Sequence, residues 1–102
     1  MPFYFAYGSN MSPPQMRARC PGARAVGRAR LEGWQFIIAA RGGANIVPRA
    51  GARVEGVLWQ VRREHLVSLN GWEGVAQGVY RRGMIRVTLG GRSVTAVTYI
   101  SD

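Results

Sequence analysis

Short β-prone runs separated by glycine-containing turns make up most of this chain, and they constrain its fold more than any other feature. Residues 3–7 alternate Phe3, Phe5 and Tyr7 with Tyr4 and Ala6, which predicts a strand buried on both faces. Residues 25–31 and 34–40 are two further β-prone runs. We expect them to form a hairpin around Glu32-Gly33.

The second half of the chain repeats this pattern. Residues 45–48 predict a short strand bounded by Pro48, and a turn that begins at Gly51 separates it from a strand at residues 54–61. Residues 79–89 and 92–100 are expected to pair around Gly90-Gly91, because paired glycines favour a tight hairpin turn.

Two short helices complete the predicted elements. Ser12-Pro13-Pro14-Gln15 provides a capping residue, a proline at the first helical position and a glutamine three places after the cap, which predicts a helix from residue 13 to about residue 20. Residues 62–69 predict the second helix, ended by Asn70-Gly71. With about six or seven strands in mostly antiparallel order, the expected fold class is α+β, a small curled sheet or β-barrel with two short helices.

The length of 102 residues allows one domain, residues 1–102, with a single hydrophobic core. Cys20 is the only cysteine, so it forms no disulfide within the chain and is expected to be buried. The chain has no apolar run of membrane-spanning length and no signal-peptide pattern at its N-terminus, which predicts a cytoplasmic protein without a membrane partner. His65, the only histidine, is expected on an exposed helix face, and no metal or cofactor is predicted.

The net charge of +9 comes from 14 basic residues, all of them arginine. Such a charge is typical of proteins that bind nucleic acid. The arginines are nevertheless scattered or at most paired, as in Arg62-Arg63 and Arg81-Arg82, and no nucleic-acid motif accompanies them. We therefore do not expect nucleic-acid binding, and keep arginine-driven binding of RNA or DNA as an alternative that predicts a steep dependence on salt.

The loop after the first predicted strand could bind an anionic group. Gly8-Ser9-Asn10 lies between that strand and the helix at Pro13, and such a turn points backbone N–H groups into a concave surface that suits a carboxylate or a developing oxyanion. The same residues are ordinary turn formers before a helix cap. The loop alone does not separate these two interpretations.

Carboxylates are scarce, which narrows the choice of an acid or base. Glu32 lies in a predicted turn, Glu64 on a helix surface and Asp102 at the terminus, which leaves Glu55 and Glu73. Glu55 occupies a predicted strand and could face either way. Glu73 follows the second helix in a predicted loop, where a solvated carboxylate paired with an arginine is the simpler interpretation from composition alone.

Several segments resemble, in the right order, the γ-glutamylcyclotransferase-like family. Residues 5–11 (Phe-Ala-Tyr-Gly-Ser-Asn-Met) resemble the family's substrate loop, and residues 69–75 (Leu-Asn-Gly-Trp-Glu-Gly-Val) resemble the segment that bears its catalytic glutamate. Residues 56–59 look like the family's central strand, and residues 78–82 and 98–100 resemble later strands. The match runs from about Phe3 to Ile100, and the combination is more specific than Tyr-Gly-Ser-Asn alone.

The resemblance implies an intramolecular aminolysis without a cofactor. The α-amino group of a γ-glutamyl amide or amine would attack its own γ-carbonyl, which releases 5-oxoproline and a free amine. Glu73 would be the general acid and base. The substrate-binding residues that the resemblance implies are Tyr7, Gly8, Ser9, Asn10, Tyr80 and Tyr99, although the three tyrosines also suit a barrel interior.

A catalytic role for Glu73 carries a structural requirement. A base that works near neutrality needs a raised pKa, whereas an adjacent arginine would lower it. We therefore expect Glu73 to be buried beside aromatic and apolar groups, with Arg81 and Arg82 directed away from it.

The chain ends two residues after Ile100, whereas many relatives continue with a further segment near the pocket. We expect a more open site that accepts larger or different γ-glutamyl substrates, or one that a second subunit completes in a homodimer; weak or absent activity is a further outcome. The leading alternative is a non-catalytic small-molecule or protein-binding module that keeps the fold. The sequence does not specify the leaving amine.

Overall fold

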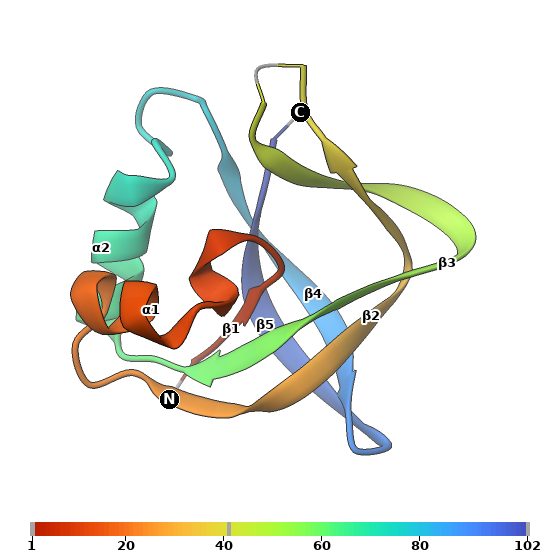
Figure 1. Cartoon of the computed structure of the whole chain (residues 1–102), viewed down its shortest axis with the longest axis horizontal. Coiled ribbons are helices and arrows are strands. Elements are labelled where there is room, and N and C mark those ends of the chain that lie inside the picture. The colour runs from red at the N-terminus through yellow and green to blue at the C-terminus, as the bar shows by residue number, and fades with distance from the viewer. Residues whose placement is uncertain (1, 41, 102) are drawn as a thin grey trace.

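Five β-strands form a closed barrel in which neighbours follow the order β1-β3-β2-β4-β5 (Figure 1). The computed structural model describes residues 2–40 and 42–101; Met1, the scattered arginine Arg41 and the terminal Asp102 lie outside these ranges. The paired strands run antiparallel, except that β1 lies parallel to β5 and so closes the barrel. The predicted α+β barrel is confirmed. The strands are β1 (Phe3–Ala6), β2 (Arg24–Ile38), β3 (Ala44–Gln60), β4 (Arg81–Leu89) and β5 (Arg92–Ile100).

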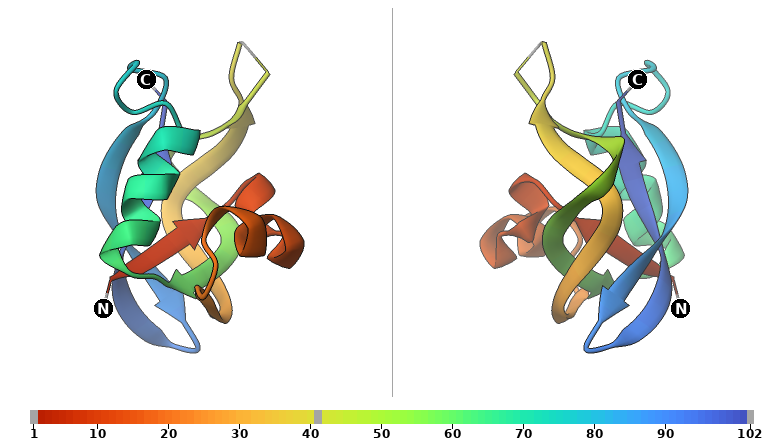
Figure 2. Two further views of the ribbon diagram at one scale, coloured as in Figure 1. Left: turned by 90° about the vertical axis from the view of Figure 1, so that its left-hand side faces the viewer. Right: turned by 90° about the vertical axis from the view of Figure 1, so that its right-hand side faces the viewer.

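The helices lie together against one side of the barrel (Figure 2). A 3-10 turn, η1 (Ser9–Met11), and α1 (Pro13–Arg19) follow β1, and α2 (Arg63–Trp72) joins β3 to β4. Helix α1 begins at Pro13 as expected, but the Ser12 side chain makes no capping hydrogen bond. None of the helices in residues 2–40 and 42–101 is long and apolar enough to cross a membrane.

Strand β2 is continuous through Glu32-Gly33, where the sequence pattern predicted a hairpin. That prediction is wrong, because β2 pairs with β3 on both sides of Gly33. Gly33 has a φ of 82°, and it produces a shift of register rather than a reversal: Glu32 faces Arg53, whereas Trp34 faces Pro48. Glycine opens a left-handed backbone conformation to both bulges and turns. Only the pairing on each side distinguishes the two.

Strand β3 also runs through a predicted break. The turn expected at Gly51 belongs to a bulge of residues 49–52, which lie opposite Gly33 while the pairing with β2 continues on either side. The chain instead reverses after β2 ends at Ile38 and before β3 begins at Ala44. The six or seven predicted strands therefore become five. Bulges of this kind bend a long two-stranded ribbon, as curvature around a barrel requires.

The predicted hairpin around Gly90-Gly91 is confirmed. Leu89 faces Arg92 across the turn, and both glycines have positive φ angles, 55° and 81°, as a two-residue turn of this class requires. Strand β4 begins at Arg81, two residues later than predicted.

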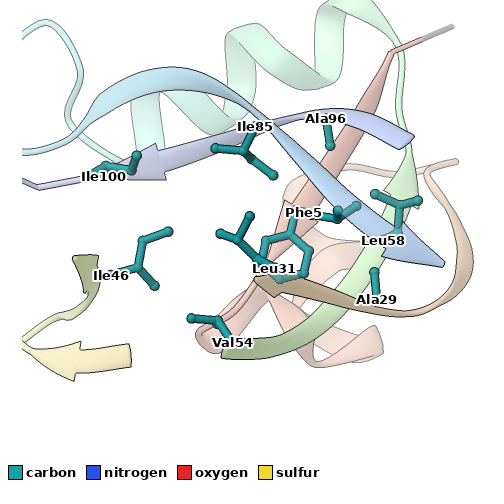
Figure 3. Packing of buried hydrophobic residues seen from close by; sticks show 10 residues of the cluster. Phe5, Ala29, Leu31, Ile46, Val54, Leu58, Ile85, Ala96 and Ile100 are labelled. Carbon is teal, nitrogen blue, oxygen red and sulfur yellow. The ribbon is translucent and has the colours of Figure 1, made fainter. Parts of the chain in front are cut away.

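The strands alternate between two apolar layers, because successive side chains of a strand point to opposite faces. In β1, Phe5 belongs to the barrel interior, whereas Tyr4 and Ala6 belong to the layer between the barrel and the helices. This explains why aromatic residues occupy both faces of the strand. The buried interior residues (Figure 3) are Phe5, Ala29, Leu31, Ile46, Val54, Leu58, Ile85, Val87, Ala96 and Ile100.

Gly56 allows β1 and β3 to approach each other closely. A Cβ atom at this position would lie 2.5 Å from the Ala6 carbonyl oxygen and 2.6 Å from the Phe5 ring. Both distances are shorter than real Cβ contacts. The Phe5 ring therefore occupies the space that a side chain at Gly56 would need.

The layer between barrel and helices buries Cys20, as predicted, and also His65. The expected exposed position of His65 is wrong, because its side chain is only 4% exposed. Its Nδ1 accepts a hydrogen bond of 3.0 Å from the Arg62 backbone N–H. Its Nε2 therefore carries the proton and donates to the Pro21 carbonyl at 2.7 Å. This second partner is distant in sequence, so the helical pattern gave no indication of the burial.

Candidate active site

A pocket of about 240 Å³ opens where η1, α1 and the C-terminal end of α2 meet the barrel. Its lining draws on segments from both ends of the chain. All seven site residues predicted from the sequence line this pocket: Tyr7, Gly8, Ser9, Asn10, Glu73, Tyr80 and Tyr99. The fold thus brings the predicted residues together, while their individual roles remain predictions.

The Asn10 side chain is used to hold the loop in place. Asn10 is only 2% exposed. Its Oδ1 accepts hydrogen bonds from Arg19 Nη1 at 3.0 Å and from Gln15 Nε2 at 3.3 Å, and its Nδ2 donates to the Tyr4 hydroxyl at 3.1 Å. Its backbone carbonyl accepts from Trp59 Nε1 at 3.1 Å. These bonds join the loop to β1, α1 and β3, and the substrate-binding role of Asn10 stays a prediction.

The loop also packs tightly against the start of β3. A Cβ atom at Gly8 would lie 3.2 Å from the Ala44 Cβ, a distance that few real Cβ contacts reach. Backbone hydrogen bonds from Met11 to Gly8 at 3.0 Å and from Ser12 to Ser9 at 3.1 Å then turn the chain toward α1. Because Gly8 has no side chain, the loop can approach Ala44, the first residue of β3 and another residue of the pocket lining.

Glu73 occupies the C-terminal cap of α2 rather than a free loop. The helix was expected to end at Asn70-Gly71 but continues to Trp72, and the Glu73 N–H donates to the Leu69 carbonyl at 2.8 Å. Gly74, with a φ of 65°, supplies the left-handed terminus that the sequence pattern placed three residues earlier. Glu73 is thereby fixed to the last turn of a helix.

Burial and charge act on Glu73 in opposite directions. Burial raises the pKa of its carboxyl group, and the positive charge of Arg19 lowers it. The side chain is partly buried, which is less than the complete burial we expected. None of the ion pairs among the described residues includes Glu73, and Arg81 and Arg82 line a neighbouring cavity rather than this pocket. The carboxylate is therefore shielded, and it has no direct cationic partner among residues 2–40 and 42–101.

Three tyrosine hydroxyls are held by acceptors in the protein. Tyr7 donates to the Tyr99 carbonyl, Tyr80 to the Ala44 carbonyl at 2.5 Å, and Tyr99 to Asn70 Oδ1 at 2.7 Å. Burial raises the pKa of Tyr7 and of Tyr99, in the latter case against the opposing charge of Arg82. The hydroxyls of Tyr7 and Tyr99 therefore stay neutral at physiological pH. The Tyr7 hydroxyl donates its own proton to the protein, so its oxygen can accept a hydrogen bond from a ligand.

The sequence analysis did not predict six of the described residues that line the pocket: Tyr4, Arg19, Gly43, Ala44, Trp72 and Thr98. Nothing in the sequence separates Arg19 from thirteen other arginines, because its place depends on how α1 packs against α2. Trp72 precedes the candidate glutamate, and that adjacency was the available signal. Gly43 leaves room for Tyr80, since a Cβ atom there would lie 2.8 Å from the tyrosine hydroxyl oxygen.

Metal ligands do not gather in the part of the chain that the structure describes, where no three His, Cys, Asp or Glu side chains are placed to hold an ion. Among the described residues that line it, the pocket instead combines one carboxylate, one guanidinium and several hydroxyls. These groups can transfer protons and can bind a polar ligand that carries a positive and a negative charge.

Curated proteins and family models relate the chain to known sequences. A family model described as gamma-glutamyl cyclotransferase, AIG2-like, matches residues 4–102. The gamma-glutamylcyclotransferase of Homo sapiens is 32% identical over 108 residues, which cover 95% of this chain and 57% of the human protein. The protein of the same name from Mus musculus is 33% identical with the same coverage. The chain therefore spans little more than half the length of these relatives.

Solved structures agree with the sequence relationships. A structure titled gamma-glutamyl cyclotransferase superimposes with a TM-score of 0.92 and 28% identity, over 99% of this chain and 66% of that one. The structure of YkqA from Bacillus subtilis superimposes with a TM-score of 0.83 and 29% identity, over 99% of this chain and 40% of that one. With the family model matching nearly all residues, this chain belongs to the gamma-glutamyl cyclotransferase, AIG2-like family.

Proposed function

We propose that this chain is a γ-glutamyl cyclotransferase, which converts a γ-glutamyl amide or amine into 5-oxoproline and a free amine, with Glu73 as the general acid and base. The observation that carries the proposal is the position of Glu73: among the described residues that line the pocket it is the single carboxylate, and it shares the pocket with the loop Tyr7-Gly8-Ser9-Asn10. The pocket is small, as suits a group of the size of one amino acid.

The proposed reaction needs only groups that the substrate and Glu73 supply. The α-amino nitrogen attacks the γ-carbonyl carbon, a five-membered ring closes, and the bond between that carbon and the amine nitrogen breaks. Glu73 accepts a proton from the attacking nitrogen and delivers it to the leaving nitrogen. No water is consumed. Because the nucleophile and the electrophile share one molecule, a correctly folded conformer can supply an effective molarity of about 10⁵ M or more.

The electrostatics of Glu73 support its role as a base. Burial raises the pKa of the carboxyl group toward the range in which a base accepts a proton from an amine. The opposing charge of Arg19 favours the carboxylate, which is the form that the first proton transfer needs. Burial is the larger of the two influences, so the pKa of Glu73 is raised and its carboxylate is more basic than one in water.

The loop and the tyrosines suit the remaining charges of the substrate. Backbone N–H groups around Gly8 and Ser9 would stabilise the oxygen that becomes negative during the attack, where each well-placed donor contributes about 3 kcal/mol. The hydroxyl oxygen of Tyr7 would accept a hydrogen bond from the substrate amine, since its own proton is donated elsewhere. Tyr99, whose hydroxyl also interacts with Arg82, would bind the substrate beside it.

A substrate screen tests the proposal. The protein is incubated with γ-glutamyl amino acids and γ-glutamyl amines, and released 5-oxoproline is measured; Glu73→Gln and the exposed helix variant Glu64→Gln serve as test and control. Turnover that falls about 10²-fold or more only in Glu73→Gln supports the mechanism. Turnover that survives Glu73→Gln overturns the role of this residue. The non-catalytic binding module predicts no turnover of any substrate in either class.

A cytoplasmic location, a homodimeric assembly and the identity of the leaving amine belong to the same proposal. Cell fractionation tests the first and sedimentation of the purified chain tests the second. The two substrate classes of the screen address the third.

A further inference from the structure

The Arg19 side chain is held by two contacts, one to the loop and one to the last residue of α2. Its Nη1 donates to Asn10 Oδ1 at 3.0 Å, and its guanidinium carbon lies 4.5 Å from the centroid of the Trp72 ring. Its own backbone carbonyl accepts a hydrogen bond of 2.7 Å from the Ser68 hydroxyl of α2. The last turn of α1 is thus fastened to α2, beside which it lies (Figure 2), and the guanidinium is fixed between the loop and the helix.

This arrangement places the guanidinium near Glu73 without contact between the two charges. Both side chains line the pocket, and Trp72 directly precedes Glu73 in the chain. The charge of Arg19 lowers the pKa of the Glu73 carboxyl group. No ion pair of 4.0 Å or less joins them in the part of the chain that the structure describes. Arg19 therefore acts on Glu73 through space.

Glu73 would be a poorer base if it formed an ion pair with Arg19, and also if the charge of Arg19 were absent. Opposite charges attract strongly in a partly buried pocket, so a guanidinium free to move would pair with the carboxylate and occupy its oxygens. Without the guanidinium, burial alone would favour the protonated form. The two tethers hold Arg19 between these two situations.

The other groups around Glu73 do not supply a compensating charge. Tyr4, Tyr7 and Tyr99 all interact electrostatically with Glu73, and burial raises the pKa of each phenol, so they remain neutral at physiological pH. Tyr80 also lines the pocket, and Arg82 acts on Tyr99. Among the described residues that line the pocket, Arg19 is the cation that faces Glu73.

We propose that Arg19 is a positioning residue of the proposed cyclotransferase: tethered by the Asn10 amide and the Trp72 ring, its guanidinium keeps Glu73 both charged and unpaired. This inference rests on the proposed function for its effect on turnover, but not for the coupling between the two side chains. It also assigns the Asn10 side chain a purpose, because the amide oxygen is one of the two tethers. Asn10 would then serve the reaction through Arg19.

The coupling is measured by NMR without any substrate. The carboxyl carbon of Glu73 in the full chain is titrated with pH, and its resonance is assigned by its loss in Glu73→Gln. In Arg19→Gln the midpoint moves to higher pH, because the carboxylate loses the cation that favours it. Arg17→Gln, an exposed neighbour on the same helix, is the matched control and leaves the midpoint in place. An unchanged midpoint in Arg19→Gln, or equal shifts in both variants, would overturn the inference.

The role of the Trp72 ring as a tether of Arg19 is tested by removing the ring. Trp72 is 61% exposed, so Trp72→Leu leaves the core intact while removing the surface on which the guanidinium lies. The freed guanidinium then pairs with the carboxylate, and the Glu73 midpoint moves to lower pH. A midpoint that stays or rises would show that the ring does not hold Arg19 away from Glu73.

Turnover separates this inference from the proposed function. In Arg19→Gln the acidic limb of the kcat/KM profile moves to higher pH. Arg19→Lys, which keeps the charge, returns the limb toward its original position. If the enzyme is active but the acidic limb of its kcat/KM profile does not move in Arg19→Gln, only the positioning role of Arg19 is overturned. A chain that releases no 5-oxoproline would overturn the proposed function, while the NMR midpoints still decide the coupling.

Discussion

The Tyr80 hydroxyl donates a hydrogen bond of 2.5 Å to the Ala44 carbonyl, which joins the segment before β4 to the first residue of β3. This bond closes one wall of the pocket, and it depends on the absence of a side chain at the neighbouring Gly43. The shape of the site is therefore determined partly by a turn that carries no chemical group of its own.

Gly43→Ala is expected to lower activity with little loss of stability. The new methyl group would lie 2.8 Å from the Tyr80 hydroxyl oxygen, so the ring must move and its hydrogen bond to Ala44 is lost. We expect kcat/KM for 5-oxoproline release to fall by about tenfold, a loss of about 1.4 kcal/mol. Gly71→Ala, where a Cβ atom meets nothing within 4 Å, is the control. Equal activity of the two variants would contradict this role for Gly43.

Glu73→Gln is expected to make the fold more stable at neutral pH. Burial raises the pKa of Glu73 above its value in the unfolded chain, so the folded state binds the proton more tightly. The free energy of unfolding of the wild-type protein, relative to that of the variant, is therefore greatest in acid, below the unfolded pKa of Glu73. This contribution is lost as pH rises through the folded pKa. A negative charge at the C-terminal end of a helix acts in the same direction.

Thermal unfolding of both proteins as a function of pH checks this sign. The gap between their midpoints should open in favour of Glu73→Gln as pH rises and then stay constant. A variant that is less stable at neutral pH, with the gap closing in acid, would show that Glu73 stabilises the fold as a carboxylate.

His65→Ala is expected to destabilise the protein by about 2 to 3 kcal/mol, because it removes two hydrogen bonds and leaves buried groups unpaired. The two bonds are those from the Arg62 N–H and to the Pro21 carbonyl, which cap α2 and fasten it to the segment after α1. Urea unfolding measures the loss. A change below about 0.5 kcal/mol, as is usual for an exposed side chain, would instead support the surface position predicted from the sequence.

Gly56→Ala is expected to destabilise the barrel by about 2 kcal/mol or more, as overpacking of a filled core does. The added carbon would meet both the Ala6 carbonyl oxygen and the Phe5 ring at under 3 Å, and the former is backbone that cannot turn aside. Gly83→Ala provides a strand control, because its nearest contacts would be at 3.5 Å and 3.7 Å. Similar unfolding midpoints for the two variants would argue against the close approach of β1 and β3.

The sequence pattern predicted the elements well where the signal was local. The alternation in β1, the proline at the start of α1 and the glycine pair between β4 and β5 each depend on neighbours within a few residues. Gly33 and Gly51 were misjudged because a bulge and a turn use the same backbone freedom. The difference lies in the partner strand, and no local rule contains that information.

The candidate site likewise contains residues that the sequence predicted and residues that it did not. The loop and Glu73 were found because their segments resemble a family in order and spacing, whereas composition alone favoured an ordinary turn and a solvated carboxylate. Arg19 was missed because its place in the pocket arises from the packing of α1 on α2, which puts one arginine of fourteen over the Trp72 ring. His65 was misplaced for the same reason, since Pro21 reaches it only through the fold.

The most direct test of the account is the release of 5-oxoproline from γ-glutamyl amino acids and γ-glutamyl amines by the wild-type chain, Glu73→Gln and Glu64→Gln. The account predicts turnover by the wild-type chain and by Glu64→Gln, and a loss of about 10²-fold or more in Glu73→Gln. Equal turnover by all three proteins would contradict the assignment of Glu73, and the absence of 5-oxoproline from every substrate would contradict the proposed function itself.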